Sequence, residues 1–188
     1  MFVKFIIQKK PFDYYMYVSQ LEILNYRNFK NFTVQLKPVT QIIGENNIGK
    51  SNLLDSLGLI FSQEVSFFKR RMLDISDFNY ETILELKKAI LDTSIEPKNI
   101  LYPKIVIKAT LKDWDLKQEA VITDWMSNSY FTEATLTYTF SPISSFDKIE
   151  EITLQRQFLQ DYEKELGTED FKKIPKSEIL NLINFPIS

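Results

Sequence analysis

The amino-acid sequence predicts a mixed α/β fold, in which a strand, a glycine-containing loop and a helix follow one another and an antiparallel sheet comes later. Residues 44–51 read Gly-Glu-Asn-Asn-Ile-Gly-Lys-Ser, which is the pattern G-x-x-x-x-G-K-[ST]. An apolar stretch precedes this octapeptide, and apolar residues at helical spacing follow it. Further along the chain, apolar and polar residues alternate as they do in strands with one face in water.

The two glycines of residues 44–51 suit a loop that wraps around phosphate groups, the Walker A loop. Gly44 and Gly49 let the backbone adopt positive φ and bend without a clash at Cβ. The amides between them, including those of Asn46 and Asn47, can point inward and form an anion site. The following helix adds the positive end of its dipole at the same place. The sequence therefore predicts that this loop binds a nucleoside triphosphate.

Two side chains at the end of the loop would complete this site. Lys50 would reach the β- and γ-phosphates, and the hydroxyl of Ser51 would bind Mg²⁺. The residues after them predict a helix with one face packed on a sheet, because apolar positions recur at helical spacing. These positions are Leu53, Leu54, Leu57, Ile60 and Phe61.

The segment before the loop predicts three strands. Alternating apolar residues indicate strands over 21–24 and 32–36, and the polar stretch 25–31 between them makes the pair a hairpin. Pro38 breaks the alternation, and a third strand over 39–43 leads into the loop.

The segment after residue 62 predicts further strands and helices. Alternation predicts antiparallel strands with one solvated face at 105–111, 120–122 and 135–140. Apolar periodicity predicts helices over 81–91, 150–166 and 177–183.

Composition limits the possible functions. The 188 residues carry a net charge of −2, so any contact with DNA would come from a local patch. The sequence contains neither Cys nor His, which excludes disulfides, thiolate metal sites and histidine chemistry. No apolar run approaches the roughly 20 residues of a membrane span, so we expect a cytoplasmic protein without a membrane partner. Trp114, Trp125 and the other aromatic residues are expected to pack in the core or on sheet surfaces.

These elements also resemble a known family. The hairpin residues Asn25-Tyr26-Arg27-Asn28-Phe29, the octapeptide GENNIGKS and the later sheet are together similar to the N-terminal lobe of ABC-type AAA ATPases of the SMC and RecF kind. The form G-E-N-N-x-G-K-S most resembles the OLD family (overcoming lysogenization defect), which includes ATP-dependent nucleases of antiphage systems such as Gabija and some retrons. Residues 71–78 also resemble the region after the first helix in such proteins.

The resemblance implies a P-loop NTPase core of ABC/SMC type with an antiparallel β subdomain. Its implied parts are an extension over 1–17, an ATP-binding lobe over 18–145, and a helical segment over 146–188 that leads to a missing second half. It also implies ATP and Mg²⁺ as cofactors and a homo-oligomer in which two subunits sandwich ATP. DNA would be a partner of the full-length protein, whose endonuclease would lie outside this chain.

The resemblance also implies site residues. Arg27 and Asn28, on the hairpin turn, would approach the nucleotide from the side. The alternative for Arg27 is a solvated charge on a turn. The residues that would line the triphosphate are Asn46, Gly49, Lys50, Ser51 and Asn52.

Several motifs of such ATPases are not found in the sequence. The chain has no run of four apolar residues followed by Asp-Glu, no Leu-Ser-Gly-Gly-like motif and no switch His. It also lacks the nuclease domain of an OLD protein, and a carboxylate that would position the attacking water. We therefore expect the front part of a larger ATPase, either as a fragment or as one half of a split protein, and its own catalytic residues are unknown.

Three other motifs are open to two interpretations. Asp113-Trp114-Asp115 matches the D-x-D of two-metal nucleases, but its place between two alternating stretches favours a hairpin turn. Lys69-Arg70-Arg71 could contact DNA phosphates or form a solvated helix end. Gln155 or Gln157 could be the glutamine that couples Mg²⁺ to lobe movement in ABC-type ATPases.

Two alternative functions stay open beside the OLD-like ATPase. One is a DNA-repair or chromosome ATPase of the RecF or SMC type without a nuclease. The other is a nucleotide-binding interaction module that does not hydrolyse ATP.

Overall fold

The computed structural model divides the chain into two compact units. Unit 1 comprises Met1–Met72 and Ile105–Phe140, and unit 2 comprises Leu73–Lys104 and Ser141–Ser188. Each unit thus combines two separate segments of the chain. The ATP-binding lobe over 18–145 and the helical segment over 146–188, which follow chain order, stay a prediction. The residues that the structure describes are 4–6, 16–46, 48–61, 73–142 and 146–185.

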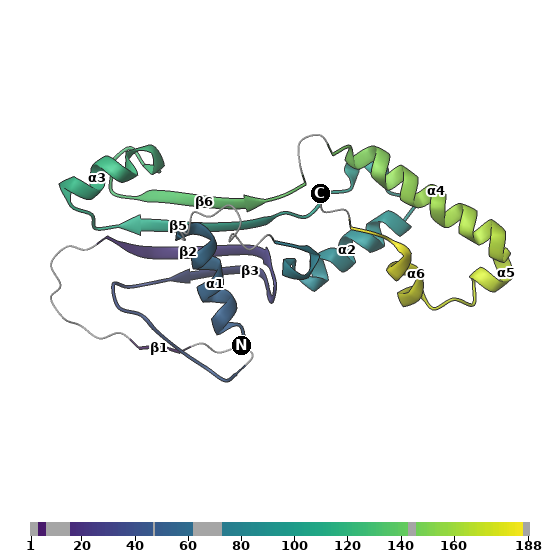
Figure 1. Ribbon diagram of the computed structural model, residues 1–188, viewed down its shortest axis with the longest axis horizontal. Helices are drawn as coiled ribbons and strands as arrows, with labels where there is room; N and C mark the ends of the chain where they lie inside the picture. The colour runs from purple at the N-terminus through teal and green to yellow at the C-terminus, as the bar shows by residue number, and fades with distance from the viewer. Residues whose placement is uncertain (1–3, 7–15, 47, 62–72, 143–145, 186–188) are drawn as a thin grey trace. The chain divides into compact units, whose positions relative to one another are not determined.

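Unit 1 is built on a four-stranded antiparallel sheet with the strand order β3-β2-β5-β6 (Figure 1). The predicted hairpin is confirmed, because β2 (Tyr17–Tyr26) and β3 (Phe29–Gln35) pair directly across a two-residue turn. The predicted strands around 105–111 and 135–140 are also confirmed, as β5 (Ile105–Lys112) and β6 (Ala134–Phe140).

Alternation in β2 and β5 gives this sheet one apolar face. Leu21 lies opposite Ala109 and Ile23 lies opposite Ile107, and all four side chains are buried. Helix α1 (Lys50–Phe61) covers part of the sheet by packing against β5 and β6. The burial of these aliphatic side chains is the main favourable term in the stability of unit 1.

A second, two-stranded sheet leads into the glycine-containing loop. Strand β4 (Gln41–Ile43) pairs antiparallel with β1 (Lys4–Ile6). Strand β4 confirms the third predicted strand in a shorter form. The loop and α1 follow it directly, as the sequence predicts.

The predicted strand at 120–122 is wrong, because these residues end helix α3 (Leu116–Ile122), which a short 3-10 helix η3 (Thr123–Trp125) follows. A capping box starts α3. The Asp115 carboxylate accepts hydrogen bonds from the amides of Lys117 and Gln118, both at 2.8 Å, and the Gln118 side chain accepts one from the Asp115 amide at 3.0 Å. Asp113 and Asp115 therefore lie between a strand and a helix and not in a hairpin turn.

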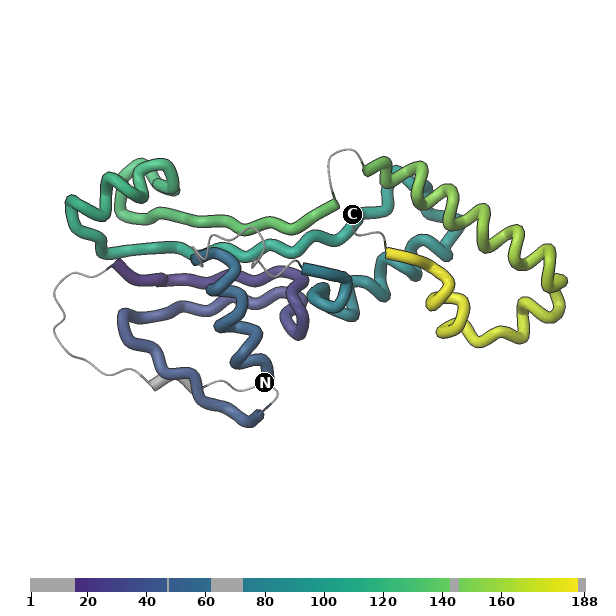
Figure 2. The backbone as a smooth tube through the Cα atoms, in the orientation of Figure 1, coloured from purple at the N-terminus to yellow at the C-terminus, as the bar shows by residue number. Residues whose placement is uncertain are grey.

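Unit 2 is helical and confirms the three helices predicted for it (Figure 2). They are α2 (Tyr80–Leu91), α4 (Lys148–Leu166) and α6 (Lys176–Leu182), joined by the short helices η1 (Ile75–Asp77), η2 (Pro97–Asn99) and α5 (Thr168–Phe171). Their apolar faces form one core, which contains Leu86, Ile90, Ile100, Ile152, Leu159 and Ile183. Among the helices of the described residues, none is long and apolar enough to cross a membrane.

The guanidinium of Arg156 on α4 closes the C-terminal end of α2. It donates hydrogen bonds to the backbone carbonyls of Ile90 at 2.9 Å, Asp92 at 2.8 Å, Ile95 at 2.9 Å and Ala89 at 3.2 Å. The last carbonyls of a helix have no partner within it, and a cation there also suits the helix dipole. Arg156 therefore ties α2, the turn after it and α4 together.

Tyr102 in unit 2 gives a first testable prediction. Its hydroxyl is buried without a hydrogen-bond partner among the residues described, and burial, with a smaller effect of Glu151, raises its pKa to about 12. Because the hydroxyl loses its hydration without compensation, Tyr102→Phe should raise the free energy of unfolding by about 1 kcal/mol in urea denaturation. The tyrosine is held neutral in the folded state, so the native chain should also lose stability between pH 10 and 12, and the variant should lose less.

The exposed Tyr80 provides the control for this prediction. Tyr80→Phe should leave the free energy of unfolding unchanged. A destabilised Tyr102→Phe variant would mean that the hydroxyl has a partner in the folded protein.

Candidate nucleotide-binding site

Gly49 in the loop occupies a position that does not accommodate a larger side chain. Gly49 has φ of +100°, in the region that favours glycine, and a Cβ atom there would lie closer than 3.0 Å to the amide group of Asn28. Gly44 does not have a positive φ, so the prediction of a positive φ is wrong for it, and a Cβ atom there would meet Cδ1 of Ile48, at the end of a flexible side chain. The loop and the hairpin turn are thus in direct contact at Gly49.

The N-terminus of α1 opens onto the loop. The amide of Leu53 bonds to the carbonyl of Gly49 at 3.0 Å, which is the first turn of the helix. Amides before this bond have no carbonyl within the helix to pair with, and they lie at the positive end of its dipole. Ser51 is exposed in this turn. The geometry therefore fits an anion bound at the start of α1. Asn47, which was predicted to take part in this site, lies outside the described residues.

Lys50 is held by the loop itself. Its Nζ donates hydrogen bonds to the carbonyl of Gly44 at 2.7 Å and to that of Glu45. The Glu45 and Asn46 side chains are exposed. A lysine in this position can exchange carbonyl oxygens for phosphate oxygens without leaving the loop, since both are hydrogen-bond acceptors.

A polar network joins the hairpin turn to α1 and the loop. Arg27 Nη1 donates to Asn52 Oδ1 at 2.7 Å and forms an ion pair with Asp55 Oδ2 at 2.6 Å. Asn52 Nδ2 donates to Asn28 Oδ1 at 2.8 Å, and Asn28 Nδ2 donates to the carbonyl of Ile48 at 3.2 Å. Arg27 is 17% exposed, so its interpretation as a solvated turn charge is wrong.

The hairpin turn adopts a strained backbone at Arg27. Its φ of +47°, like the +57° of Asn25, lies in the left-handed region that arginine rarely adopts. Such a conformation costs on the order of 1–3 kcal/mol and persists where surrounding contacts fix it. Here the contacts are those to Asn52 and Asp55, together with a cation–π contact in which the guanidinium lies 4.9 Å from the Tyr26 ring centroid. The turn therefore keeps an unfavourable backbone conformation in which Arg27 and Asn28 lie beside the loop.

The two glutamines predicted from the sequence both lie on α4 in unit 2. Gln155 is buried and donates to Glu151 Oε1 at 2.6 Å and to the carbonyl of Asn184 at 3.0 Å. Gln157 is exposed and bonds to Asp161. Each has a local structural partner, and a role beside Mg²⁺ stays a prediction for both.

The remaining sequence motifs contribute no further site among the described residues. No group of three or more Asp or Glu side chains that could hold a metal ion is found there, and Asp115 instead caps α3. The basic residues 69–71 lie outside the described part of the chain, as does the start of the 71–78 segment. Asp55 is the one member of the polar network that the sequence predictions missed. Its spacing of three from Asn52 places both on one face of α1, which was the available signal.

Comparison with known proteins identifies the family. The DNA replication and repair protein RecF of Clostridium perfringens is 40% identical over 43 residues, and that of Clostridium beijerinckii is 44% identical over 43 residues. Each match covers 22% of this chain and 12% of the relative, so only a short part of either protein is compared. No solved structure matches the chain. The family model of the AAA ATPase domain matches residues 16–188, which is nearly the whole chain. Together with the loop geometry above, this match shows that the chain belongs to the AAA ATPase domain family and is an ATP-binding domain of the P-loop class.

Proposed function

We propose that this chain is the ATP-binding N-terminal part of an OLD-like ATPase, whose ATP cycle regulates a DNA endonuclease in antiphage defence. The observation that carries the ATP-binding part is the contact of the hairpin turn with the loop, in which Asn28 bonds to Ile48 and Asn52. The two segments that carry the family resemblance are therefore in direct contact, which supports the proposal. The nuclease and defence role rests on the G-E-N-N-x-G-K-S form of the loop.

The loop residues would hold ATP and Mg²⁺ in distinct ways. Lys50 would give up the carbonyls of Gly44 and Glu45 for the β- and γ-phosphates, and the amides at the start of α1 would face the same anion. Ser51 would supply a hydroxyl oxygen to Mg²⁺, which favours oxygen ligands. Mg²⁺ would neutralise charge between the phosphates. Asn46 and Asn52 would complete the lining of the site.

Arg27 would act from the side of this site. Its guanidinium is anchored to Asp55 and Asn52, so it is pre-oriented and does not need to be ordered when a nucleotide binds. In an ATP sandwich of two subunits, a cation at this position would also stabilise the charge of the triphosphate. We therefore assign Arg27 and Asn28 to the nucleotide site and propose that the full-length protein forms a homo-oligomer that contacts DNA.

The second candidate function is a RecF- or SMC-type ATPase that acts in DNA repair or chromosome organisation without a nuclease. The local identity with RecF proteins favours it. The third candidate is a nucleotide-binding module that does not hydrolyse ATP. DNA cleavage by the full-length protein would separate the first candidate from the second, and ATP turnover would separate both from the third.

Equilibrium binding of a fluorescent ATP analogue with Mg²⁺ tests the site. We expect saturable binding by the native chain, and Lys50→Ala should weaken it about 100-fold, as expected for the loss of a charged donor worth roughly 3 kcal/mol. Ser51→Ala should bind with little dependence on Mg²⁺. In the full-length protein, Lys50→Ala should remove the dependence of DNA cleavage on ATP.

The exposed Lys37, which precedes β4, is the matched control, and Lys37→Ala should bind as the native chain does. Equal affinity of the Lys50→Ala and native chains would contradict the assignment of Lys50. A folded full-length protein that binds ATP and never cleaves DNA would contradict the nuclease role and leave ATP binding intact.

A further inference from the structure

The connection between β5 and β6 lies at one end of the sheet of unit 1 (Figure 1). It exposes several large apolar side chains. This connection, residues 113–133, contains α3, η3 and a loop, and we name it the end cap. Its inner side is packed, because Ile122 is buried with Leu111 and Ala134. Its exposed large apolar side chains are Leu116 at 86%, Val121 at 69%, Trp125 at 40%, Tyr130 at 84% and Phe131 at 61%. Trp125, which was expected in the core or on a sheet surface, lies instead in the exposed part of η3.

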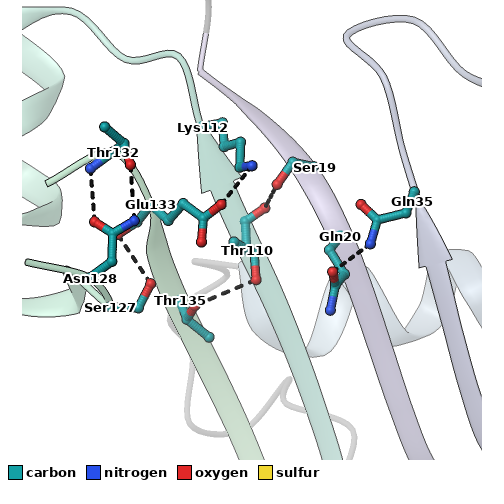
Figure 3. A network of polar contacts seen from close by, with 10 residues as sticks. All are labelled: Ser19, Gln20, Gln35, Thr110, Lys112, Ser127, Asn128, Thr132, Glu133 and Thr135. Atoms are coloured by element: carbon teal, nitrogen blue, oxygen red, sulfur yellow. Dashed lines mark hydrogen bonds and ion pairs between the residues drawn. The ribbon is translucent and has the colours of Figure 1, made fainter. Parts of the chain in front are cut away.

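The loop of the end cap is ordered by its own hydrogen bonds (Figure 3). Asn128 Oδ1 accepts a hydrogen bond from the amide of Thr132 at 3.0 Å, and Asn128 Nδ2 donates one to the hydroxyl of Thr132 at 2.9 Å. Both the amide and the hydroxyl of Ser127 donate to the carbonyl of Glu133, at 2.9 and 3.1 Å. The Glu133 carboxylate in turn pairs with Lys112 of β5 at 2.6 Å. The loop is thus fixed to the sheet at its base.

The tip of this ordered loop presents Tyr130 and Phe131 to solvent. Phe131 has φ of +54°, a left-handed conformation that a phenylalanine adopts only under constraint. A strained aromatic residue that points outward from a fixed loop is a feature of recognition surfaces, because the loop is already ordered and loses little conformational entropy when a partner binds.

An open pocket of about 560 Å³ lies at the start of α3. It is lined by Trp114, Asp115, Leu116, Lys117 and Glu119. An indole and an aliphatic side chain next to carboxylates fit a ligand that combines an apolar part with a positive charge.

The charge of the end cap restricts what can dock on it. Residues 112–133 carry a net charge of −3, because the Glu133 carboxylate pairs with Lys112 and the segment contains four further carboxylates but one further lysine, Lys117. These four are Asp113, Asp115, Glu119 and Asp124. The surface would repel nucleic acid phosphates and anionic lipid. It would also repel the same surface of a second copy, because like charges would face each other.

We propose that the end cap is a docking surface for a basic, apolar segment of a partner protein. The apolar face of that segment would cover the exposed side chains of α3 and of the loop tip. Its lysines or arginines would pair with the surrounding carboxylates, such as Glu119 and Asp124. This surface is separate from the nucleotide loop and goes beyond the proposed ATPase function.

The tryptophan fluorescence of the protein reports on the end cap, since Trp114 and Trp125 are the two tryptophans of the chain. The probes are two synthetic amphipathic helical peptides without tryptophan, which share one leucine face and carry either lysine or glutamate on the other. With the full chain, we expect a saturable shift in emission for the lysine peptide, weaker at high salt, and none for the glutamate peptide.

Two sets of variants localise the effect. Leu116→Ser with Tyr130→Ser should weaken binding of the lysine peptide by about tenfold, because exposed apolar anchors are removed without disturbing the core. Glu119→Lys with Asp124→Lys should reverse the preference toward the glutamate peptide. Leu101→Ser in unit 2, at an equally exposed leucine, is the matched control and should leave binding unchanged.

Four outcomes would overturn the proposal. They are no emission shift, equal binding of both peptides, an emission shift that depends on protein concentration without peptide, and stronger binding of a single-stranded oligonucleotide than of the lysine peptide. The third outcome would assign the surface to a second copy of this chain, and the fourth would assign it to nucleic acid.

Discussion

Gly49→Ala is expected to abolish binding of the ATP analogue, with a loss of more than about 100-fold in affinity. The added Cβ atom would meet Nδ2, Cγ and Oδ1 of Asn28, all closer than 3.0 Å. An alanine at position 49 would also have to adopt φ of +100°, a backbone conformation that is strained for any residue with a side chain. The loop and the hairpin turn could then not keep their present contact, and the amides at the start of α1 would move with the loop.

A double variant separates the two causes. Asn28→Ala removes the colliding amide, so Gly49→Ala with Asn28→Ala should recover part of the lost affinity if the collision dominates. If the positive φ dominates, the double variant should bind no better than Gly49→Ala. Binding of the ATP analogue, measured with circular dichroism to establish that each variant is folded, gives the answer.

Gly58, on the helix α1 that follows the loop, provides a control. A Cβ atom there would meet nothing within 4 Å, and alanine has the higher helix propensity. Gly58→Ala should therefore bind the analogue as the native chain does and raise the free energy of unfolding by about 1 kcal/mol. Native affinity in Gly49→Ala would contradict the loop geometry and the role given to Gly49.

The local parts of the fold could be predicted from the sequence because their signals are local. The hairpin shows an alternation of period two on both sides of a polar turn, and α1 follows a loop with a recognisable pattern. The stretch at 120–122 was too short for alternation to decide between strand and helix. The deciding signal was the capping box of Asp115 and Gln118, three residues apart, which the sequence also contains.

The arrangement of the site and of the two units depends on contacts between distant segments. The spacing of Asn52 and Asp55 places them on one helix face, but their pairing with Arg27 on another element requires the folded chain. The division into units likewise depends on β5 joining β2, which brings together residues on either side of α2. Neither property follows from the order of elements along the chain.

Arg156→Ala is expected to lower the free energy of unfolding of unit 2 by about 3 kcal/mol, because a charged donor to several partly buried carbonyls is lost. The variant would leave the carbonyls of Ala89, Ile90, Asp92 and Ile95 without the guanidinium. It would also remove the cation from the C-terminal end of the α2 dipole. Hydrogen–deuterium exchange should therefore accelerate in α2 and the turn after it, while β2 and β5 of unit 1 keep their protection.

The geometry of the side chain also predicts what a conservative replacement does. Arg156→Lys keeps the charge but offers a single nitrogen in place of the planar fork, so it cannot reach carbonyls on both sides of the turn and should recover only part of the loss. Lys164→Ala on the same helix removes an exposed ion pair with Asp161 and should leave exchange unchanged. Full recovery by Arg156→Lys would mean that charge at the helix end, and not the fork of hydrogen bonds, stabilises this part of unit 2.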